Sequence, residues 1–412
     1  MNPSFHIIDF VIVGIYAILL VGVGLWVSRT KKGHTKTAED YFLASKALPW
    51  WAIGSSLIAA NISAEQFIGM SGSGFAGGLA IASYEFMAAL TLIIVGKFFL
   101  PIFIKQGIYT IPEFVEKRFS TNLKTILAVF WIALFVFVNL TSVLFLGGKA
   151  IDTIVGVGDG SMIVPAIIAL AIFAAAYSLY GGLSAVAWTD VIQVALLVIG
   201  GIITTLIALH YVTPDGGILN GISHIADAAS DKFDMVLSRD NKEFNNLPGI
   251  YVLIGGLWVA NLYYWGFNQY IIQRTLAAKS LTEAQRGIAF AAFLKMLIPF
   301  IVVIPGIVAW VMYSEDLYGA RSAFEIAGST ALNNDNAYPW LISTFIPVGV
   351  KGLVLAALAA AIVSSLASML NSTSTIFTMD IYKPYINREA SQTKLVNVGR
   401  LTAGIALIIA VC

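Results

Sequence analysis

The stretch Ser55–Gly78, SSLIAANISAEQFIGMSGSGFAGG, lies inside an apolar region long enough to cross a membrane. It nevertheless carries four polar side chains, Asn61, Ser63, Glu65 and Gln66, and then three glycines, Gly69, Gly72 and Gly74. A charged or amide side chain in hydrocarbon is costly unless it faces a cavity or a partner, and glycine weakens a helix. The stretch therefore predicts a helix that is interrupted near mid-membrane, with a binding site at the break.

The composition predicts an all-α polytopic membrane protein that is embedded in the lipid bilayer. Of 412 residues, 58% are hydrophobic and only 11% are charged, against about 25% charged in a soluble domain. The apolar runs are near-continuous, as in helical spans, rather than alternating as in the strands of a barrel. The net charge of +1 gives no indication of a nucleic-acid partner.

No enzyme signature is present, and no organic cofactor is expected. The single cysteine, Cys412, excludes an intramolecular disulfide and a cysteine metal cluster. The four histidines lack metal-ligand spacing, and neither GxxxxGK[ST] nor GxSxG occurs. The first apolar run, 10–27, has no basic leader or clear cleavage site, so it is expected to remain as a helix.

Ten apolar spans are predicted, at 10–27, 50–73, 80–104, 125–148, 161–180, 186–211, 249–271, 287–313, 350–378 and 397–412. The last is shorter than the ~20 residues that a span needs, so the stop at Cys412 is interpreted as a C-terminal truncation. With the N-terminus outside, 16 of the 24 Lys and Arg residues fall on the inner side and six on the outer side, as the positive-inside rule expects. The polar loops 212–248 and 314–349 are then extracellular caps.

A second interrupted helix is predicted at Gly255–Gln269, GGLWVANLYYWGFNQ, five spans after the first. Five is an odd number, so two such halves have opposite topology, which is typical of inverted-repeat transporters. The predicted division is an N-terminal helix and linker (1–48), a first repeat (49–211), an extracellular loop (212–248) and an incomplete second repeat (249–412). The two halves show no clear residue-level identity.

Two adjacent hydroxyls, Ser364 and Ser365, follow Ala361 by about one helical turn. Hard cations prefer oxygen ligands, and the break near Ala59–Ile62 frees backbone carbonyls. Together these oxygens would make a neutral cage that suits a monovalent ion. The alternative is that these small residues only allow helices to pack closely.

Four ionisable residues lie within the predicted spans: Glu65, Glu85, Asp190 and Lys295. With the amides Gln66 and Asn261 they offer donors and acceptors for a polyhydroxylated ligand. The alternative is a structural ion pair, or snorkelling to the membrane surface.

An aromatic group in the second broken helix, together with two residues near the first, offers flat apolar faces for a sugar ring. Its members are Trp258, Tyr263, Tyr264, Trp265 and Phe267, with Met70 and Tyr84. The alternative is an aromatic belt at the membrane surface.

Several long motifs closely resemble the sodium/solute symporter family, in its sodium–glucose cotransporter branch. They are DYFLASKALPWWAIGSSLIAANISAEQFIGMSGSG, GIYTIPEFVEKRF, YSLYGGLSAVAWTDVIQ, GGLWVANLYYWGFNQYIIQRTLAAKS and AALAAAIVSSLASMLNSTSTIFTMDIYK. The resemblance runs from about residue 8 to the end. It implies a leucine-transporter-like inverted repeat of five plus five helices with an extra N-terminal helix, the second repeat being incomplete here.

The resemblance also implies roles for individual residues. Sodium would be held by backbone oxygens of Ala59, Ile62 and Ala361 and by the hydroxyls of Ser364 and Ser365. Sugar hydroxyls would be bound by Gln66, Glu85, Asn261 and Lys295. Tyr264 would be the inner gate, Met70 and Tyr84 would lie on the outer side, and Asp190 would be linked to cation coupling. Ala88 stands where the family's bacterial galactose site has a serine.

The expected function is sodium-coupled import of a sugar, galactose or glucose, by alternating access in a bacterial inner membrane. One alternative is a symporter for another solute, such as an inositol, an amino acid or a carboxylate. A carboxylate would call for a helix N-terminus or an arginine, and no arginine lies at the middle of a predicted span. Another alternative is a membrane sensor that binds a solute without transporting it. A channel is disfavoured because no selectivity filter is recognisable.

Overall fold

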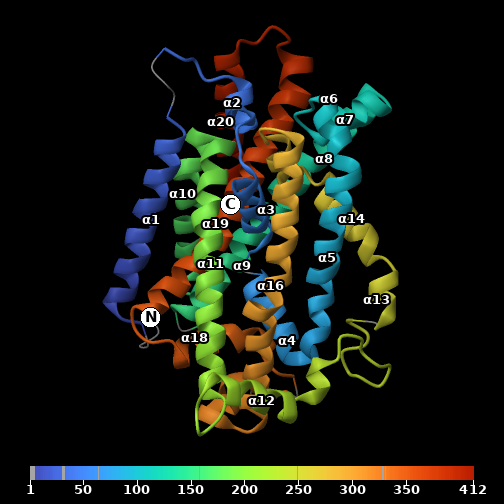
Figure 1. Ribbon diagram of the computed structural model, residues 1–412. Coiled ribbons are helices and arrows are strands. Elements are labelled where there is room, and N and C mark those ends of the chain that lie inside the picture. The colour runs from blue at the N-terminus through green and yellow to red at the C-terminus, as the bar shows by residue number, and fades with distance from the viewer. Residues whose placement is uncertain are drawn as a thin grey trace.

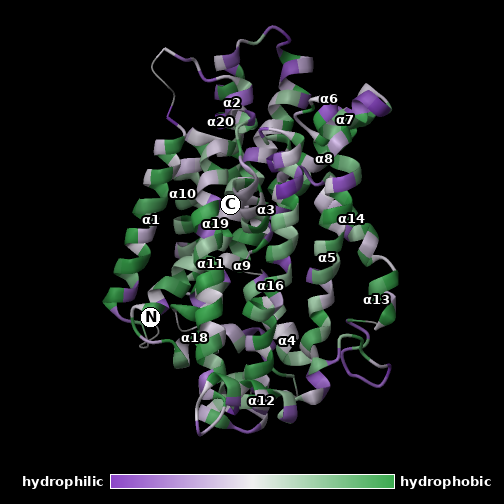
Figure 2. Cartoon of the chain, in the orientation of Figure 1, coloured by the Kyte–Doolittle hydropathy of each residue, from purple (hydrophilic) through white to green (hydrophobic). Residues whose placement is uncertain are grey.

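The structure, a computed structural model, describes residues 5–29, 33–63, 65–156, 158–247, 249–326, 329 and 331–412. These residues form helices and no strand, apart from isolated bridges at Leu48–Ala278 and Glu325–Leu332. Long helices run side by side from one end of the molecule to the other (Figure 1). Hydrophobic residues dominate their middle sections and hydrophilic residues gather at the two ends (Figure 2), which is the pattern of a protein that spans a bilayer.

Eight helical runs in the described residues have the length and hydropathy to cross a membrane. They are Ile7–Val27, Gln66–Gln106, Thr121–Ile154, Ile163–Gly181, Leu183–Tyr211, Leu281–Ser314, Val350–Ile386 and Gln392–Val411. The prediction of an all-α, multi-pass membrane protein is confirmed. The two expected spans that are missing from this set, 50–73 and 249–271, contain α3 (Trp50–Asn61) and α14 (Leu257–Phe267), which are too short to cross alone.

The run Gln66–Gln106 is not one straight helix. It comprises α4 (Ser71–Gly77) and α5 (Ser83–Ile94), joined by the 3₁₀ segment η3 (Gly78–Ala82), and continues into α6 (Leu100–Gln106). Gly78 has φ +75°, and a Cβ there would lie 2.2 Å from the carbonyl oxygen of Lys232. Only glycine fits this turn, which separates two of the predicted spans.

The other long helices are α1 (Ile7–Val27), α8 (Thr121–Ala133), α9 (Thr141–Ile154), α10 (Ile163–Gly181), α11 (Leu183–Tyr211), α16 (Leu281–Ser314), α19 (Val350–Ile376) and α20 (Gln392–Val411). The shorter ones are α2 (Ala38–Phe42), α7 (Ile111–Arg118), α12 (Ile218–Ala228), α13 (Ile250–Ile254), α15 (Gln269–Leu276), α17 (Ala320–Phe324) and α18 (Ala337–Phe345). Wider π-helical turns occur at η2 (Glu65–Met70), η4 (Val95–Phe99), η5 (Leu134–Leu140) and η9 (Phe377–Ile386). Further 3₁₀ segments are η1 (Ala44–Lys46), η6 (Ser230–Phe233), η7 (Leu317–Gly319) and η8 (Asn334–Asn336).

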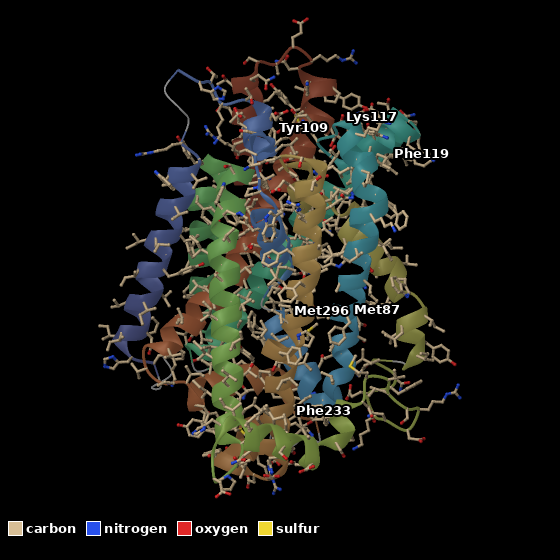
Figure 3. The ribbon with its side chains drawn as sticks, viewed as in Figure 1. Met87, Tyr109, Lys117, Phe119, Phe233 and Met296 are labelled. Carbon is tan, nitrogen blue, oxygen red and sulfur yellow. The ribbon has the colours of Figure 1, made fainter. Side chains whose placement is uncertain are left out.

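The two ends of the molecule differ. Tyr109, Lys117 and Phe119 lie at the end that carries α7, whereas Phe233 lies at the opposite end, beside α12 (Figure 3). The start of α1 lies toward the α12 end (Figure 1). The start of α1 and the long loop around α12 therefore lie toward the same side, as the predicted topology requires.

Glycine contacts hold the first broken helix against α16. A Cβ at Gly54 of α3 would lie 2.7 Å from the carbonyl oxygen of Gly287, and a Cβ at Gly306 would lie 2.1 Å from that of Ser71 in α4. Small residues allow membrane helices to approach this closely. The long helix α16 therefore packs along both parts of the broken helix and fixes where the break lies.

Candidate functional site

The first broken helix opens where the sequence predicts. Helix α3 ends at Asn61, and Ile62 adopts an extended conformation with ψ 121°. The chain resumes as the π-helical turn η2 from Glu65. Carbonyls at the end of α3 therefore lie outside a continuous α-helical ladder and are available to other partners.

Ser365 of α19 faces this break. Its Oγ lies 3.1 Å from the carbonyl oxygen of Ala60, 3.3 Å from that of Ile62 and 3.2 Å from that of Ala361. The side chain is buried. A hydroxyl has one proton to donate, so it satisfies one of these carbonyls at a time. The remaining oxygens form a neutral, oxygen-rich cluster of the kind that coordinates a monovalent cation.

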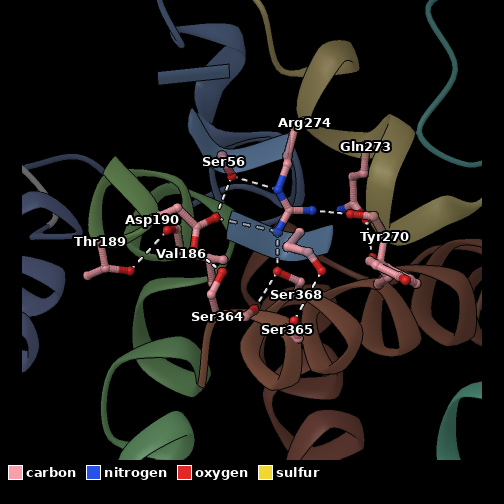
Figure 4. A network of polar contacts seen from close by, with 12 residues as sticks. Ser56, Val186, Thr189, Asp190, Tyr270, Gln273, Arg274, Ser364, Ser365 and Ser368 are labelled. Carbon is pink, nitrogen blue, oxygen red and sulfur yellow. Dashed lines mark hydrogen bonds and ion pairs between the residues drawn. The ribbon is translucent and has the colours of Figure 1, made fainter. Parts of the chain in front are cut away.

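The neighbouring Ser364 points the other way, to a buried carboxylate. Its Oγ donates to Oδ1 of Asp190 at 2.5 Å, and Ser56 of α3 donates to Oδ2 at 2.5 Å. Asp190 is fully buried in α11. This carboxylate therefore connects the first broken helix with the serine helix α19 (Figure 4).

A buried arginine, Arg274 of α15, completes this network (Figure 4). Its Nη2 lies 3.5 Å from Oδ2 of Asp190, and its Nε donates to Ser56 Oγ at 2.6 Å. It also donates to the carbonyl of Tyr270 and to Ser368 Oγ. A buried charge needs a partner of opposite charge, and Arg274 and Asp190 are partners for one another. Together with their hydrogen-bonded serines they connect four helices, α3, α11, α15 and α19.

A second buried ion pair joins α5 to α16. Nζ of Lys295 lies 2.5 Å from Oε2 of Glu85, and both side chains are buried. Gln66 of η2 donates to the other carboxylate oxygen, Oε1, at 3.1 Å. Three of the residues predicted to bind a polar ligand are therefore in direct contact.

Asn261 and Trp265 extend this group on α14. The Lys295 ammonium lies 5.4 Å from the centre of the Trp265 ring, within range of a cation–π contact. Trp265 Nε1 donates to Oδ1 of Asn261 at 3.2 Å, and Asn261 donates to the carbonyl of Leu257 at 3.0 Å. The second broken helix thereby reaches the ion pair through an aromatic ring.

Tyr264 lies between the two breaks. Its hydroxyl receives a hydrogen bond from Nδ2 of Asn61 at 2.9 Å and lies 2.7 Å from the hydroxyl of Tyr270. One tyrosine of the second broken helix thus contacts the end of α3.

A central cavity of about 530 Å³ opens beside these residues. Its lining combines amides and hydroxyls with apolar groups: Ala60, Asn61, Ser63, Gln66, Met70, Ser73, Ile81, Val138, Asn139, Ser142, Val143, Tyr264, Tyr270, Ser365 and Met369. The volume is in the range of small-molecule sites. The candidate cation position at Ser365 borders the same cavity.

Not every predicted residue reaches this cavity. Tyr263 is 43% exposed and stacks on Trp131, with ring centres 5.6 Å apart. Tyr84 is 38% exposed. Neighbouring residues on a helix point about 100° apart, so Tyr263 faces away while Tyr264 lines the cavity. Four other predicted residues are buried beside the cavity without lining it, and Gln66 is the member of their group that does line it: Glu85, Asn261, Trp265 and Lys295.

The remaining predicted residues lie as follows. Ser365 contacts the carbonyl of Ala60, whereas the resemblance implies Ala59. Ala88 is buried in α5, three residues after Glu85. The aromatic Phe267 packs on Phe99 and Phe103, and Trp258 donates to the carbonyl of Leu253, so neither lines the cavity. The side chain of Glu65 lies outside the described residues.

Sequence reasoning missed three residues. Asn139 of η5 and Ser142 of α9 line the cavity. The sequence signal that could have found them is a polar side chain inside a predicted apolar span. Arg274 follows the predicted span 249–271 by three residues, so the sequence alone assigns it to an inner loop. The intramembrane Asp190 could have indicated it, because a buried carboxylate calls for a counter-charge.

Comparisons with known proteins agree with this architecture. The model of the sodium:solute symporter family matches residues 41–412. The chain is 65% identical to the sodium/glucose cotransporter of Vibrio parahaemolyticus over 98% of this chain and 74% of that protein. It is 33% identical to the human sodium/myo-inositol cotransporter over 98% of this chain.

The fold also matches a solved structure of a Na⁺-coupled sialic acid symporter in a substrate-bound, outward-open state. The TM-score is 0.84 at 27% identity, covering 99% of this chain and 80% of that one. The chain spans 74% of the Vibrio relative but only 58% of the human one. The predicted family is thus confirmed, and it is a family of transporters rather than enzymes. The chain belongs to the sodium:solute symporter family.

Proposed function

We propose that this protein imports a sugar, galactose or glucose, together with sodium by alternating access. The observation that carries the proposal is the shared geometry of two polar sites. The oxygen cluster at Ser365 borders the same 530 Å³ cavity that Gln66 and Tyr264 line. A cation and a polar solute would therefore be bound between the same helices, as coupling between them requires.

Sodium is assigned to the carbonyls of Ile62 and Ala361, with that of Ala60 or Ala59, and to the hydroxyl of Ser365. Ser364 would join the ligand set by turning from Asp190 toward the break, which makes Asp190 the coupling residue. Bound sodium would tie α3 to α19 and order the cavity between them. This follows from the chemistry of the donors, because hydroxyl and carbonyl oxygens suit a hard cation.

The sugar is assigned to Gln66, Glu85, Asn261 and Lys295, with Tyr264 as the inner gate and Met70 on the outer side. Carboxylate, ammonium and amide groups can donate to and accept from sugar hydroxyls. Alanine at position 88 removes one hydroxyl from the region of Glu85. A single neutral hydrogen bond contributes about 0.5–1.5 kcal/mol, so this change would tune sugar preference rather than abolish binding.

The finer architecture belongs to the same proposal. We assign 49–211 and 249–412 to two inverted repeats of the leucine-transporter type, preceded by the extra helix in 1–48 and separated by the extracellular loop 212–248. The two helix breaks support this assignment. Helix α3 ends at Ile62 and α14 ends at Asn268, and both residues have extended backbone, with ψ 121° and 122°. The N-terminus is placed outside a bacterial inner membrane.

The alternative solute is an inositol. The relatives that are 32–34% identical include sodium/myo-inositol cotransporters, and a cyclic polyol would use the same donors and acceptors. A carboxylate is less suited to the site, because the buried Arg274 is already committed to Asp190.

The test is uptake of labelled galactose, glucose and myo-inositol by the full-length protein in proteoliposomes, with sodium or potassium gradients. Galactose or glucose uptake that requires sodium supports the proposal. If myo-inositol is the only one of the three taken up with sodium, the substrate is an inositol rather than a sugar. Absence of sodium-dependent uptake of all three, from protein that still unfolds cooperatively, would contradict it.

A further inference from the structure

A second cavity lies at the opposite side of the molecule from α12, between the end of α1, the following linker and the start of α11. Its volume is about 330 Å³, and it is lined by Val27, Ser28, Arg29, His34, Lys36, Asp40, Ser45 and Ser184. It is separate from the central cavity, and no lining residue is shared. The proposed sugar transport makes no use of it.

The cations around this cavity lack counter-ions. Among the described residues, Arg29, Lys36 and Arg400 take part in no ion pair, whereas some basic residues elsewhere, Lys46, Lys117 and Lys124, pair with a glutamate. Lys36 and Arg400 converge instead on carbonyls at the end of α10. Their nitrogens lie 3.3 Å and 3.1 Å from the carbonyl oxygen of Tyr180.

The one carboxylate in the lining, Asp40, is occupied by its own neighbours. It accepts from the backbone N–H of Thr37 at 2.8 Å and from Ser45 Oγ at 2.6 Å, and it lies 2.7 Å from His34 Nε2. The adjoining first turn of α11, where Ser184 lies, contains no acidic residue and no side-chain cap. Its free N–H groups add partial positive charge on the same side. The cavity therefore carries a net positive charge, with Arg29 and Lys36 set against the single carboxylate of Asp40.

Apolar surface adjoins these cations. Helix α1 has most of its surface outside the protein interior, and Leu25 and Trp26, just before the cavity, are 37% and 69% exposed. Exposed tryptophan near the end of a membrane helix marks the interface between lipid and water. The cavity therefore lies where phospholipid head groups meet the protein.

We propose that this cavity binds the phosphate of an anionic phospholipid head group, with the acyl chains lying along α1. Arg29 and Lys36 contact the phosphate, and Arg400 supplies further positive charge from behind Lys36. Basic pockets between membrane helices on the positively charged side of a protein are suited to such head groups. The bound lipid neutralises charge that the protein leaves unpaired and joins α1 to α10 and α11.

The experiment measures thermal unfolding of the full-length protein in detergent with added dioleoylphosphatidylglycerol, dioleoylphosphatidylcholine or inorganic phosphate. The anionic lipid is expected to raise the unfolding midpoint on the order of 3 °C above the zwitterionic one, because it binds the folded state. Inorganic phosphate at the same concentration is expected to have no such effect. Native mass spectrometry of the same samples counts the retained lipids.

Two variants and a control locate the effect. Lys36→Gln and Arg29→Gln are each expected to remove at least half of the shift and weaken retention about fivefold, as loss of one basic contact does. Lys105→Gln, an exposed lysine of α6, is expected to retain the full shift. If Lys36→Gln does not fold, the exposed Arg29 alone decides the test. A full shift in Arg29→Gln would overturn the proposal, as would equal protection by inorganic phosphate, which would assign the cavity to a soluble anion.

Discussion

At the scale of single residues, the position of Ser365 is the centre of the proposed sodium site. Three carbonyl oxygens lie within 3.3 Å of its Oγ, which has one proton to offer. Ser364, one residue earlier, is hydrogen bonded to Asp190. Of these two adjacent serines, Ser365 contacts the carbonyls at the break and Ser364 contacts Asp190. Substitutions at each should therefore separate cation binding from coupling.

Ser365→Ala is expected to raise the half-saturating sodium concentration for transport about fivefold, since one oxygen ligand is worth about 1 kcal/mol. Sodium titration of uptake measures this. The matched control is Ser374→Ala, because Ser374 is a buried serine of the same helix that donates to the carbonyl of Asn371. Equal sodium dependence in Ser365→Ala and the wild type would rule out the assigned sodium ligand.

Lys295→Met is expected to lower the free energy of unfolding by about 3–5 kcal/mol, because it leaves the buried carboxylate of Glu85 unpaired. The double variant Lys295→Met/Glu85→Leu should recover most of that stability while still failing to bind sugar. Thermal unfolding and sugar binding, measured on the same preparations, test both halves. Wild-type sugar affinity in the double variant would show that the ion pair is structural only.

Lys36 gives the proposed lipid site a pH dependence. Burial, and then the neighbouring Arg400, lower the pKa of Lys36 from 10.5 to about 8, while Asp40 opposes the change. The rings of Tyr41 and Tyr180 are the other titratable groups against it, and Arg29 and His34 share its cavity. The phosphate diester stays ionised, so stabilisation by phosphatidylglycerol should shrink as pH rises from 7 to 9.

Without lipid, Lys36 has the opposite effect on how stability changes with pH. Because the folded-state pKa of Lys36 lies below its unfolded value, the unfolded chain binds more protons between about pH 8 and 10.5, and this residue contributes a gain in stability as pH rises through that window. Lys36→Gln is expected to remove both pH effects, the loss of lipid stabilisation and the gain in lipid-free stability. A lipid effect that falls equally with pH in Lys36→Gln would assign the titration to another group.

At the scale of elements, side-chain hydrogen bonds join the start of the extra helix α1 to the start of the serine helix α19. Oδ1 of Asp9 accepts hydrogen bonds from the backbone N–H groups of Gly349 and Gly352, at 2.7 and 2.9 Å. A Cβ at Gly352 would lie 2.6 Å from the carbonyl oxygen of Asp9, so the contact needs glycine. A carboxylate at the start of a helix also interacts favourably with its dipole.

Asp9→Ala is therefore expected to lower the free energy of unfolding by about 1.5–3 kcal/mol, the range for hydrogen bonds to a charged group. The sodium dependence of uptake should stay unchanged, since Asp9 lies far along α19 from Ser365. Thermal unfolding and sodium titration measure the two effects. An unchanged unfolding midpoint would show that α1 is not held by this contact.

The sequence predicts the elements well where a single physical rule dominates. Continuous apolar runs indicate membrane helices, and polar residues with glycines indicate the break after Asn61. The π-helical turns such as η2 and η5 are not predictable in this way. They depend on how the backbone accommodates neighbouring helices, a tertiary effect that leaves no simple pattern.

At the scale of the whole molecule, pairs of opposite charge in the spans were easier to predict than orientation around a helix. Glu85 and Lys295 are costly alone, and they form the ion pair that the sequence left open as the alternative to ligand binding. Tyr263 and Tyr264 have the same chemistry, and only packing decides that Tyr264 faces the cavity while Tyr263 faces Trp131. Arg274 was missed because its place near a span end resembles that of a loop residue, although it is buried.

The proposed mechanism treats the molecule as two sites joined through shared helices. Sodium at Ser365 would order α3 against α19, and the sugar would bind between the broken helices beside them. Any such coupling is reciprocal, because each ligand must change the affinity of the other by the same factor.

The most direct test of this account is binding of labelled galactose to the full-length protein, measured with and without saturating sodium, alongside sodium titrations with and without galactose. We predict that each ligand raises the affinity for the other by the same factor, within the range of about 5–150-fold that is typical of coupled sites. Galactose affinity that is the same in sodium and in potassium would contradict sodium-coupled sugar transport by this protein.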